Sequence, residues 1–344
     1  MEHLTSFLAA LGEPEIEDAE EESFLLFSQD IPSANLGFVD SRATTIDLTI
    51  HDQDYTIHQS PTLLSSSRAG GTTGAVLWKI TPLIAEWLSN TTSTTNNPNP
   101  LWTHTLLTPT STIVELGCGI SALNALALAP KIAHYIATDQ DYVYRLFRQN
   151  LEANAHTHTH TPQTRSGGSG RQREKGHGKG HGKKGKGSTL QSGAGPGQGQ
   201  GQRQGNIIFT SLDWELDVAG SLKEGVGIST STSVSDGEGR EGDKGFDLIL
   251  SCDCIYNDAL VAPLVRTCAD LCRLRPVYKE GEGAGEGRKP TVCVIAQQQR
   301  SPEVFEAWLR ETMRVFRVWR VSDEMLGEKL RLGSGYLVHL LLLK

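Results

Sequence analysis

The chain has 344 residues, of which 38% are hydrophobic and 21% charged, which is enough for one large globular domain or two smaller ones. Its formal net charge of −8 argues against a general nucleic-acid binder. No apolar run reaches the roughly 18 residues that a membrane-spanning helix needs. The first residues, MEHLTSFLAALGEPEIEDAEEE, carry acids where a signal peptide has a basic region. We therefore expect a soluble intracellular protein in the cytoplasm, with the nucleus as a second candidate location.

The first part of the chain has three features of different kinds. Residues 1–40 are acidic and are expected to be flexible, with one short helix over residues 4–11. Residues 45–58 alternate around a polar turn, which predicts a β-hairpin. A helical face follows, made of Leu77, Ile80, Ile84 and Leu88. The proline at position 82 is expected to kink or restart this helix.

From residue 112 onward, strand and helix patterns alternate to the end of the chain. The expected strands are 112–116, 134–139, 206–210, 246–252, 291–297, 316–321 and 336–343. This alternation predicts an α/β fold with a Rossmann-like, doubly wound, seven-stranded sheet that is mostly parallel and preceded by the hairpin. The last two strands have no obvious helix between them, so one of them is expected to be antiparallel. The whole domain is assigned to residues 41–344.

Three insertions interrupt this domain. Residues 156–205 are rich in Gly, Gln and His with a net charge near +8, and residues 219–245 and 279–289 are rich in Gly and Glu. Such compositions bury too little apolar surface to order themselves, so we expect disordered loops. The basic tract 165–203 could also contact polyanions weakly, with a strong salt dependence.

The six cysteines do not predict a metal site. They lie at positions 118, 252, 254, 268, 272 and 293, and no two of them form a CxxC pair. Structural zinc sites need spaced pairs of ligands. We expect reduced cysteines packed as small hydrophobic residues, and no bound metal.

A glycine turn follows the first strand of the alternation. In VELGCGISA, Glu115 ends the strand and Gly117 and Gly119 form the turn before a helix, an arrangement that directs backbone N–H groups toward a ligand. Asp139 ends the next strand, where a carboxylate can bind ribose hydroxyls. The same glycines with Ala122 satisfy the loose dinucleotide fingerprint, so a nicotinamide cofactor is an alternative. Glu115 favours a ligand with an amino acid moiety, such as S-adenosylmethionine.

The motifs in their order resemble one family. The segments GAVLWKITPLIAEWL, VELGCG, LDW and DCIY, with Asp139, are similar to those of the seven-β-strand protein-lysine methyltransferases. This group is methyltransferase family 16, which has a D-x-x-Y motif, and it includes the fungal ribosomal lysine methyltransferases of type five, which the chain resembles most. The similarity covers residues 45–344 apart from the insertions. Each motif is modest alone, but their order and spacing are specific.

The resemblance implies S-adenosylmethionine as the cofactor, a protein lysine as the methyl acceptor, and a large-subunit ribosomal protein as the substrate. It implies cofactor-binding roles for Trp78, Gly117, Cys118, Gly119, Asp139, Trp214 and Cys252. It implies catalytic roles for Asp253 and Tyr256. Two positions depart from the family pattern: Ser121 replaces the third glycine, and Cys252 stands where alanine is common. A serine there is expected to cap the following helix.

The chemistry of Asp253 and Tyr256 can be narrowed further. A carboxylate favours the charged ammonium form of a nearby lysine, so Asp253 is expected to capture and orient the lysine rather than deprotonate it. Tyr256 is expected to form part of an aromatic wall. Cys254 and Ile255 replace the two prolines that are usual in methyltransferases acting on base amines, which favours a protein lysine. The alternatives are a nicotinamide-dependent oxidoreductase, a non-catalytic ribosome- or RNA-binding module, and an RNA methyltransferase.

Overall fold

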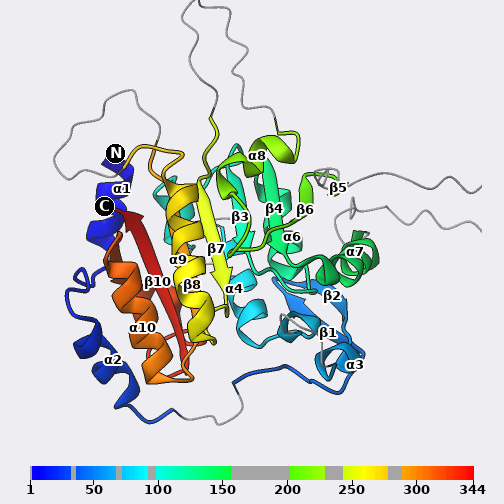
Figure 1. Cartoon of the computed structure of the whole chain (residues 1–344), viewed down its shortest axis with the longest axis horizontal. Helices are drawn as coiled ribbons and strands as arrows, with labels where there is room; N and C mark the ends of the chain where they lie inside the picture. Colours follow the sequence, from blue (N-terminus) through cyan, green and yellow to red (C-terminus); the bar gives the residue numbers. More distant parts are fainter. Residues whose placement is uncertain are drawn as a thin grey trace, which may run out of the picture.

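The computed structural model describes residues 2–31, 36–66, 72–91, 98–155, 202–228, 243–277 and 289–344. Within these residues, one eight-stranded sheet forms the centre of the molecule, with strand order β5-β6-β4-β3-β7-β8-β10-β9 (Figure 1). Its strands are β3 (Thr112–Leu116), β4 (His134–Asp139), β5 (Gln202–Gln204), β6 (Ile207–Ser211), β7 (Leu248–Cys252), β8 (Val292–Gln298), β9 (Phe316–Arg320) and β10 (Tyr336–Leu343). A separate antiparallel hairpin consists of β1 (Thr45–Ile50) and β2 (Gln53–His58).

The predicted fold class is confirmed. Strands β6, β4, β3, β7 and β8 pair in parallel, and β10 pairs antiparallel with both β8 and β9, as expected for the end of the chain. The sheet has one strand more than the seven predicted, because β5 pairs antiparallel with the edge strand β6. β5 has only three residues, Gln-Arg-Gln, whose polar sequence gives no strand signal.

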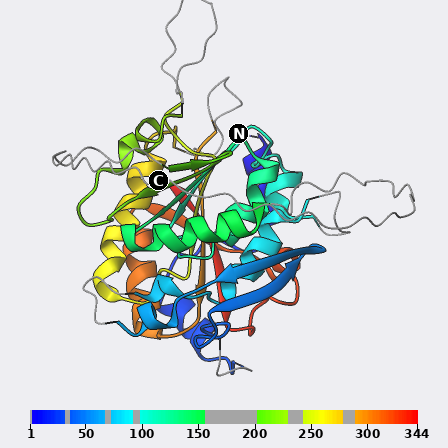
Figure 2. The ribbon, with the colours of Figure 1, turned by 90° about the vertical axis from the view of Figure 1, so that its right-hand side faces the viewer.

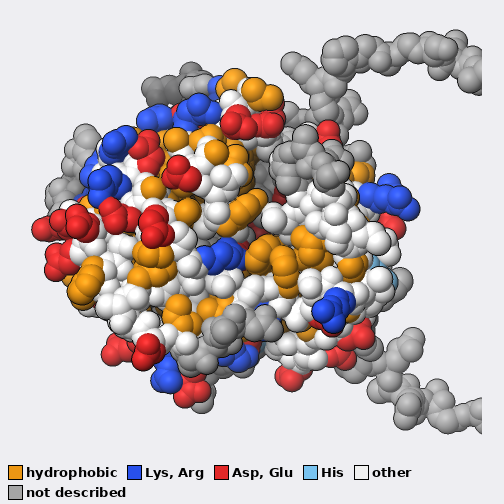
Figure 3. Space-filling model, turned by 60° about the horizontal axis from the view of Figure 1, so that its bottom comes forward, with side chains coloured by type: hydrophobic (Ala, Val, Ile, Leu, Met, Phe, Trp, Pro, Cys, Tyr) orange, Lys and Arg blue, Asp and Glu red, His pale blue; other side chains and the backbone are white. Residues whose placement is uncertain are grey.

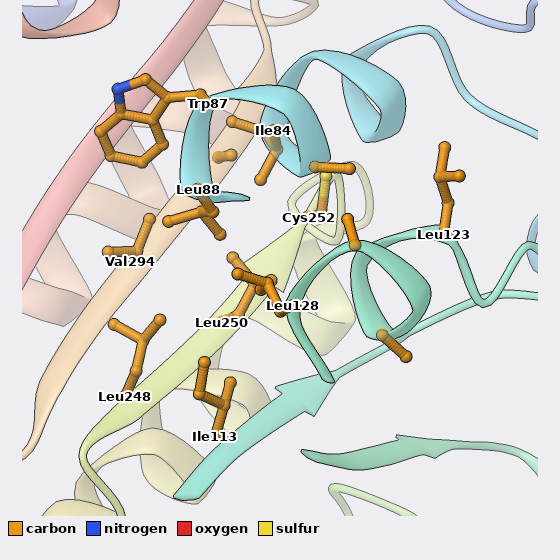
Figure 4. Packing of buried hydrophobic residues seen from close by; sticks show 14 of the residues in the cluster. Ile84, Trp87, Leu88, Ile113, Leu123, Leu128, Leu248, Leu250, Cys252 and Val294 are labelled. Atoms are coloured by element: carbon orange, nitrogen blue, oxygen red, sulfur yellow. The ribbon is translucent and has the colours of Figure 1, made fainter. Parts of the chain in front are cut away.

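Helices cover both faces of the sheet. On one face lie α2 (Ala19–Phe27), α8 (Leu222–Gly225), α9 (Asp258–Cys272) and α10 (Pro302–Met313). On the other face lie α1 (Glu2–Ala10), α4 (Ile80–Ser89), α6 (Leu123–Leu128) and α7 (Tyr144–Ala153). Figure 4 shows side chains of α4 and α6 meeting those of β3, β7 and β8 in a buried layer that includes Leu88, Leu128 and Leu250. None of the described helices is long and apolar enough to cross a membrane.

Short elements complete the described chain. They are α3 (Pro61–Leu64), α5 (Pro100–Thr103), α11 (Asp323–Leu326) and the 3-10 turns η1 (Thr73–Ala75), η2 (Ala129–Lys131), η3 (Asp141–Val143) and η5 (Ala219–Ser221). Helix α4 begins just two residues before Pro82, which fits the expected restart, because proline is tolerated in the first turn of a helix. Helix α10 begins as the sequence suggests, with Ser301 accepting a bond from the backbone N–H of Val304 and Pro302 at the first helical position.

The strand order reverses at β3, and this places the functional site. After β3 the chain crosses to β4 and β6 on one side, and then returns to β7 on the other. Because the connections leave β3 and β7 in opposite directions, a crevice opens between the carboxyl ends of these two strands. The glycine turn follows β3 and Asp253 follows β7, so the two predicted motifs lie at the same edge of the sheet.

The hairpin is attached to the rest of the fold by two asparagines one helical turn apart. Asn150 lies on α7, and Asn154 is the cap residue just after its end. Asn150 Oδ1 accepts from the backbone N–H of His58 (2.7 Å), and its Nδ2 donates to the carbonyls of His58 (2.9 Å) and Ile120 (2.7 Å). Asn154 makes the matching pair of bonds with Thr56. The amides thus bond to β2 as a third strand would, and Asn150 links the hairpin to the loop that contains the glycine turn. Figure 2 shows α7 lying beside the hairpin.

The acidic N-terminal segment contains two helices, where the sequence suggests one short helix in a flexible lead. Leu4, Phe7 and Leu11 are buried against the sheet, and the backbone N–H of Ile16 donates to Val318 of β9 at 2.8 Å. Its acids meet arginines of β9: Arg317 pairs with Glu15, and Arg320 with Glu13 and Glu22. These partners are about 300 residues away in sequence, which is why local composition does not reveal them. The boundary at residue 40 stays a prediction.

Most of each predicted insertion lies outside the described residues, including nearly all of the basic tract 165–203. The described margins contain β5 and, within 219–245, η5 and α8. The expected disorder and the expected polyanion contact therefore stay predictions.

We predict that Asn150→Ala destabilises the protein by about 2–4 kcal/mol, because the buried carbonyl of Ile120 and the part-buried carbonyl and N–H of His58 lose their partner. The free energy of unfolding in urea measures this loss. Gln149→Ala, at an exposed position on the same helix, is the matched control and should change stability by less than about 0.5 kcal/mol. Equal stabilities of the two variants would contradict the role given to Asn150.

Candidate active site

The glycine turn after β3 has a backbone that only glycine adopts easily. Gly117 has φ +72° and Gly119 has φ +60°. A Cβ at Gly117 would lie 2.4 Å from Sγ of Cys254 and 3.3 Å from the ring of Trp214. The N–H groups of Gly117 and Cys118 donate to the carbonyl of Thr138, at 2.9 and 3.0 Å, so the turn is fixed against the end of β4. The turn is therefore tightly enclosed by three other segments of the chain.

The serine at the third position of the turn is not the helix cap that the sequence suggests. Ala122 stands at the cap position of α6 with φ +56°, and Ser121 Oγ accepts from the backbone N–H of Leu123 at 3.3 Å. Ser121 lies one residue before the cap position, and it still satisfies one free N–H at the start of the helix.

Asp139 lies at the end of β4, beside the turn. Its Oδ2 accepts from the backbone N–H of Gly119 at 2.8 Å, and its Oδ1 accepts from that of Gln140 at 2.7 Å. Burial raises the pKa of Asp139 to about 6, and the two N–H donors offset only part of the desolvation. The side chain is thus held with its carboxylate at the wall of the crevice.

Glu115, the last but one residue of β3, is buried in the same wall. Its Oε1 accepts from Asn124 Nδ2 (2.6 Å) and its Oε2 from the hydroxyl of Tyr135 (2.8 Å). Burial raises its pKa to about 7, although both hydrogen bonds favour the ionised form. Both oxygens are thus already bonded, so a ligand would have to share them.

Two tryptophans border the crevice. Trp214 follows β6 and packs on Gly117, and its Nε1 is buried without a hydrogen-bond partner among the described residues. Its carbonyl accepts from Arg266 of α9 at 2.7 Å, which fixes the loop. Trp78 lies opposite, with its Nε1 donating to the carbonyl of Thr73 at 3.0 Å and its ring 4.4 Å from that of Phe38.

The D-x-x-Y residues differ in exposure. The Asp253 side chain is only 2% exposed, whereas Tyr256 is 39% exposed. Asp253 has φ +64°, an uncommon conformation outside glycine. Its carboxylate is paired with Arg300, a residue that no sequence motif singles out. The hydroxyl of Tyr256 lies 3.0 Å from Oγ1 of Thr73.

The predicted site residues come together in one pocket of about 1020 Å³, its open mouth included. Its lining contains every residue assigned from the sequence: Trp78, Gly117, Cys118, Gly119, Asp139, Trp214, Cys252, Asp253 and Tyr256. Figure 3 views the molecule from the end that carries this pocket, where hydrophobic side chains gather near the middle of the face. Their roles stay predictions.

Sequence reasoning missed several lining residues. Thr73 and Gly74 come from η1, and Gln140 and Tyr142 come from the chain after β4. The carbonyl of Gly74 accepts from the backbone N–H of Ile120 at 3.0 Å, so η1 is held across the glycine turn. Only the glycine in TTGAV offered a signal, and a glycine in a loop is too common to be specific.

Three thiols line the pocket, those of Cys118, Cys252 and Cys254, and all are buried. Burial raises the pKa of both Cys118 and Cys252 well above the ordinary value. Cys252 Sγ lies 3.9 Å from Oγ1 of Thr81. Neither Cys118 nor Cys252 is thus activated as a nucleophile. Among the described residues, no group of three or more His, Cys, Asp or Glu side chains is arranged to hold a metal ion.

We predict that Gly117→Ala lowers the free energy of unfolding by about 2–4 kcal/mol, because the new methyl group clashes with Cys254 and the positive φ is strained. Gly225→Ala is the matched control: a Cβ there meets no atom within 4 Å. Urea denaturation of both variants measures the difference. A Gly117→Ala protein as stable as Gly225→Ala would show that the turn is not constrained.

We also predict that Glu115 makes stability depend on pH. Its pKa is raised in the folded state, so the folded protein retains a proton that the unfolded chain loses, and stability falls as pH rises from about 4.5 to 7. At 1.36 kcal/mol per pKa unit, the effect approaches about 3 kcal/mol. Glu115→Gln should remove most of this fall, measured as unfolding free energy at pH 5 and pH 8 without ligand. An unchanged pH dependence in the variant would contradict the assignment.

Comparisons with known proteins relate part of this site to a family. Residues 57–165 match the model of a family described as lysine methyltransferase, and they contain Trp78, the glycine turn and Asp139. The ribosomal lysine N-methyltransferase 5 of Zygosaccharomyces rouxii is 26% identical over 83% of this chain and 78% of its own length. That of Candida glabrata is 29% identical over 29% of this chain and 33% of its own length.

A further relative has a different name. The diaminohydroxyphosphoribosylamino-pyrimidine deaminase of Schizosaccharomyces pombe is 35% identical over 140 residues, which are 40% of this chain and 32% of that protein. The chain thus spans about a third of the length of this relative. Among solved structures, a putative methyltransferase from Streptococcus mutans gives a TM-score of 0.41 at 8% identity, over 88% of this chain and 56% of that one. This likeness is too low to bear on function. The family match over residues 57–165 and the long Zygosaccharomyces alignment agree with the resemblance found in the sequence: the chain is similar to the lysine methyltransferase family.

Proposed function

We propose that this protein is an S-adenosylmethionine-dependent protein-lysine N-methyltransferase whose substrate is a ribosomal protein of the large subunit. The observation that carries the proposal is the single pocket in which the glycine turn, Asp139 and Trp214 face Asp253 and Tyr256. The ribosomal substrate is inferred from the name of the relatives in Zygosaccharomyces rouxii and Candida glabrata. A cytoplasmic location, with the nucleus as a second one, follows from such a substrate.

The residues present fit an adenosine with an amino acid tail. Trp214 offers a flat apolar surface and a buried Nε1 with no partner in the described structure. Asp139 presents a carboxylate for ribose hydroxyls, and Gly117 leaves no side chain between this tryptophan and Cys254. Glu115 and Trp78 line the same pocket and would hold the methionine end. This acidic end of the pocket suits an ammonium group better than the second phosphate of a dinucleotide.

The chain's own contribution is to place and desolvate the acceptor. When bound, S-adenosylmethionine would supply an electrophilic methyl carbon: the new C–N bond would form as the C–S bond breaks with its electron pair left on sulfur, and the methylated ammonium would then release a proton to solvent. Such an in-line displacement depends on placing the amine about 3–3.5 Å from the methyl carbon. Tyr256 stands at the mouth, half-exposed, and Asp253 is buried behind it, so a lysine passing the tyrosine ring would reach the carboxylate.

The direct test is incubation of the purified protein with labelled S-adenosylmethionine and ribosomal subunits, followed by mass spectrometry of the labelled product. We expect methyl groups on a lysine of a large-subunit protein. Label that nuclease treatment removes would assign an RNA substrate instead. Partner binding without any methyl incorporation would favour a non-catalytic module.

We predict that Trp214→Ala weakens S-adenosylmethionine binding about 10- to 100-fold, because stacking on an aromatic side chain contributes about 1–3 kcal/mol per base. Isothermal titration calorimetry measures this change. Leu216→Ala, on the same loop and at an 82% exposed position, is the control and should bind as the unchanged protein does. Stabilisation of the unchanged protein by NAD but not by S-adenosylmethionine in a thermal shift experiment would instead support the oxidoreductase alternative.

A further inference from the structure

Arg300 is the partner of the motif aspartate. It lies two residues after β8 and two before α10, and its side chain is 23% exposed. Its Nη1 donates to Oδ1 of Asp253 at 2.8 Å, and its Nη2 to Oδ2 at 2.5 Å. This two-bond geometry is the strongest that a carboxylate and a side-chain cation form. The backbone N–H of Gln298 adds a third bond, to Oδ1 at 3.0 Å.

The guanidinium is also held from its other side. It lies over the ring of Trp78, 4.6 Å from the centroid. Trp78 is bonded to the carbonyl of Thr73, and the hydroxyl of Thr73 is bonded to that of Tyr256. The two residues of the D-x-x-Y motif are thus connected through Arg300, Trp78 and Thr73, none of which belongs to the motif.

These contacts change what Asp253 can do for an incoming lysine. A carboxylate offers about four acceptor positions, and three are used by Arg300 and Gln298. One position on Oδ2 remains for the acceptor amine. The charge of Asp253 is already balanced by a cation, so it no longer favours an ammonium over an amine as an unpaired carboxylate would.

The balance of charge matters because only the neutral amine can attack. A free lysine has a pKa near 10.4, so roughly one in a few thousand is neutral at pH 7. An unpaired carboxylate close to the amine would raise that pKa by about one to three units and make the neutral form rarer still. A paired carboxylate can orient the amine without this penalty.

We propose that Arg300 is a positioning residue that cancels the charge of Asp253, so that Asp253 orients the acceptor lysine while the lysine stays free to lose its proton. This inference rests on the proposed methyl transfer. It replaces the view, suggested by the sequence, of Asp253 as a negatively charged clamp for an ammonium.

The other titratable groups near Asp253 and Arg300 have pKa values that differ from the range in which an acceptor lysine would lose its proton. Burial raises the pKa of Tyr336 on β10 to about 12, and it raises those of Tyr256, Cys252 and Cys254 from their ordinary values. Asp139 and Glu115 have pKa values of about 6 and 7. Glu303, in the first turn of α10, accepts a bond from Ser301 and its pKa is lowered. Above about pH 7.5, the pH dependence of kcat should therefore report mainly the acceptor lysine.

The test compares kcat against pH at saturating S-adenosylmethionine and substrate for the unchanged protein and for Arg300→Met. We expect the midpoint of the profile to rise by about one pH unit or more, so that kcat is about tenfold lower at pH values below the midpoint of the unchanged protein and recovers at pH values above the raised midpoint. Arg300→Lys keeps the positive charge and should leave the midpoint within about 0.3 units. The double variant Asp253→Asn/Arg300→Met removes both charges and should bring the midpoint back.

The matched control is Arg310→Gln, which breaks an exposed ion pair with Glu306 on α10 and should leave the whole profile unchanged. A kcat for Arg300→Met that is reduced by the same factor at every pH would show a merely structural role and overturn the proposal, as would an unshifted midpoint. If Arg300→Met does not fold, the other two variants decide, and a raised midpoint in the double variant overturns the proposal. If the protein without any substitution methylates no substrate protein, the proposed function is overturned, and this inference with it.

Discussion

The close meeting of two strand ends is the constraint on which the rest of the site depends. β3 and β7 are neighbours at the centre of the sheet, and each is followed directly by a left-handed residue, Gly117 at φ +72° and Asp253 at φ +64°. The two turns approach so closely that a Cβ on Gly117 would overlap Cys254. Because the strand order reverses between β3 and β7, the two turns diverge beyond this contact, and the pocket lies between them.

The same place concentrates three carboxylates, of which Glu115 and Asp253 are buried and Asp139 is half-buried, and the fold stabilises each in a different way. Glu115 has two neutral side-chain donors, Asp139 has two backbone N–H groups, and Asp253 has a guanidinium. Neutral donors do not fully offset desolvation, so the pKa values of Glu115 and Asp139 are raised. Under the proposed function, a cofactor that carries an ammonium and a sulfonium would supply the positive charge that these two acids lack.

Much of this arrangement could be predicted from the sequence, because strand periodicity locates the ends of parallel strands and those ends share one edge of the sheet. Gly117, Asp139 and Asp253 each follow or end such a strand, and all three line the pocket. What could not be predicted depends on contacts between distant segments. Arg300 and the arginines of β9 look like surface charges in the sequence, yet they pair with Asp253 and with acids near residue 15. The αL conformation of Ala122 in place of a serine cap is likewise set by how the turn packs.

The acceptor half of the site therefore depends on parts of the chain that the motifs do not contain. Tyr256 is bonded to Thr73 in η1, and η1 is held over the glycine turn by the bond from Ile120 to Gly74. The carbonyl of Ile120 in turn accepts from Asn150, which also holds the hairpin. A displacement of the hairpin would thus be transmitted through these hydrogen bonds to the tyrosine at the pocket mouth. Under the proposed function, the D-x-x-Y motif would supply the reacting edge of the site, whereas the geometry of that edge is set by the hairpin, α7 and Arg300.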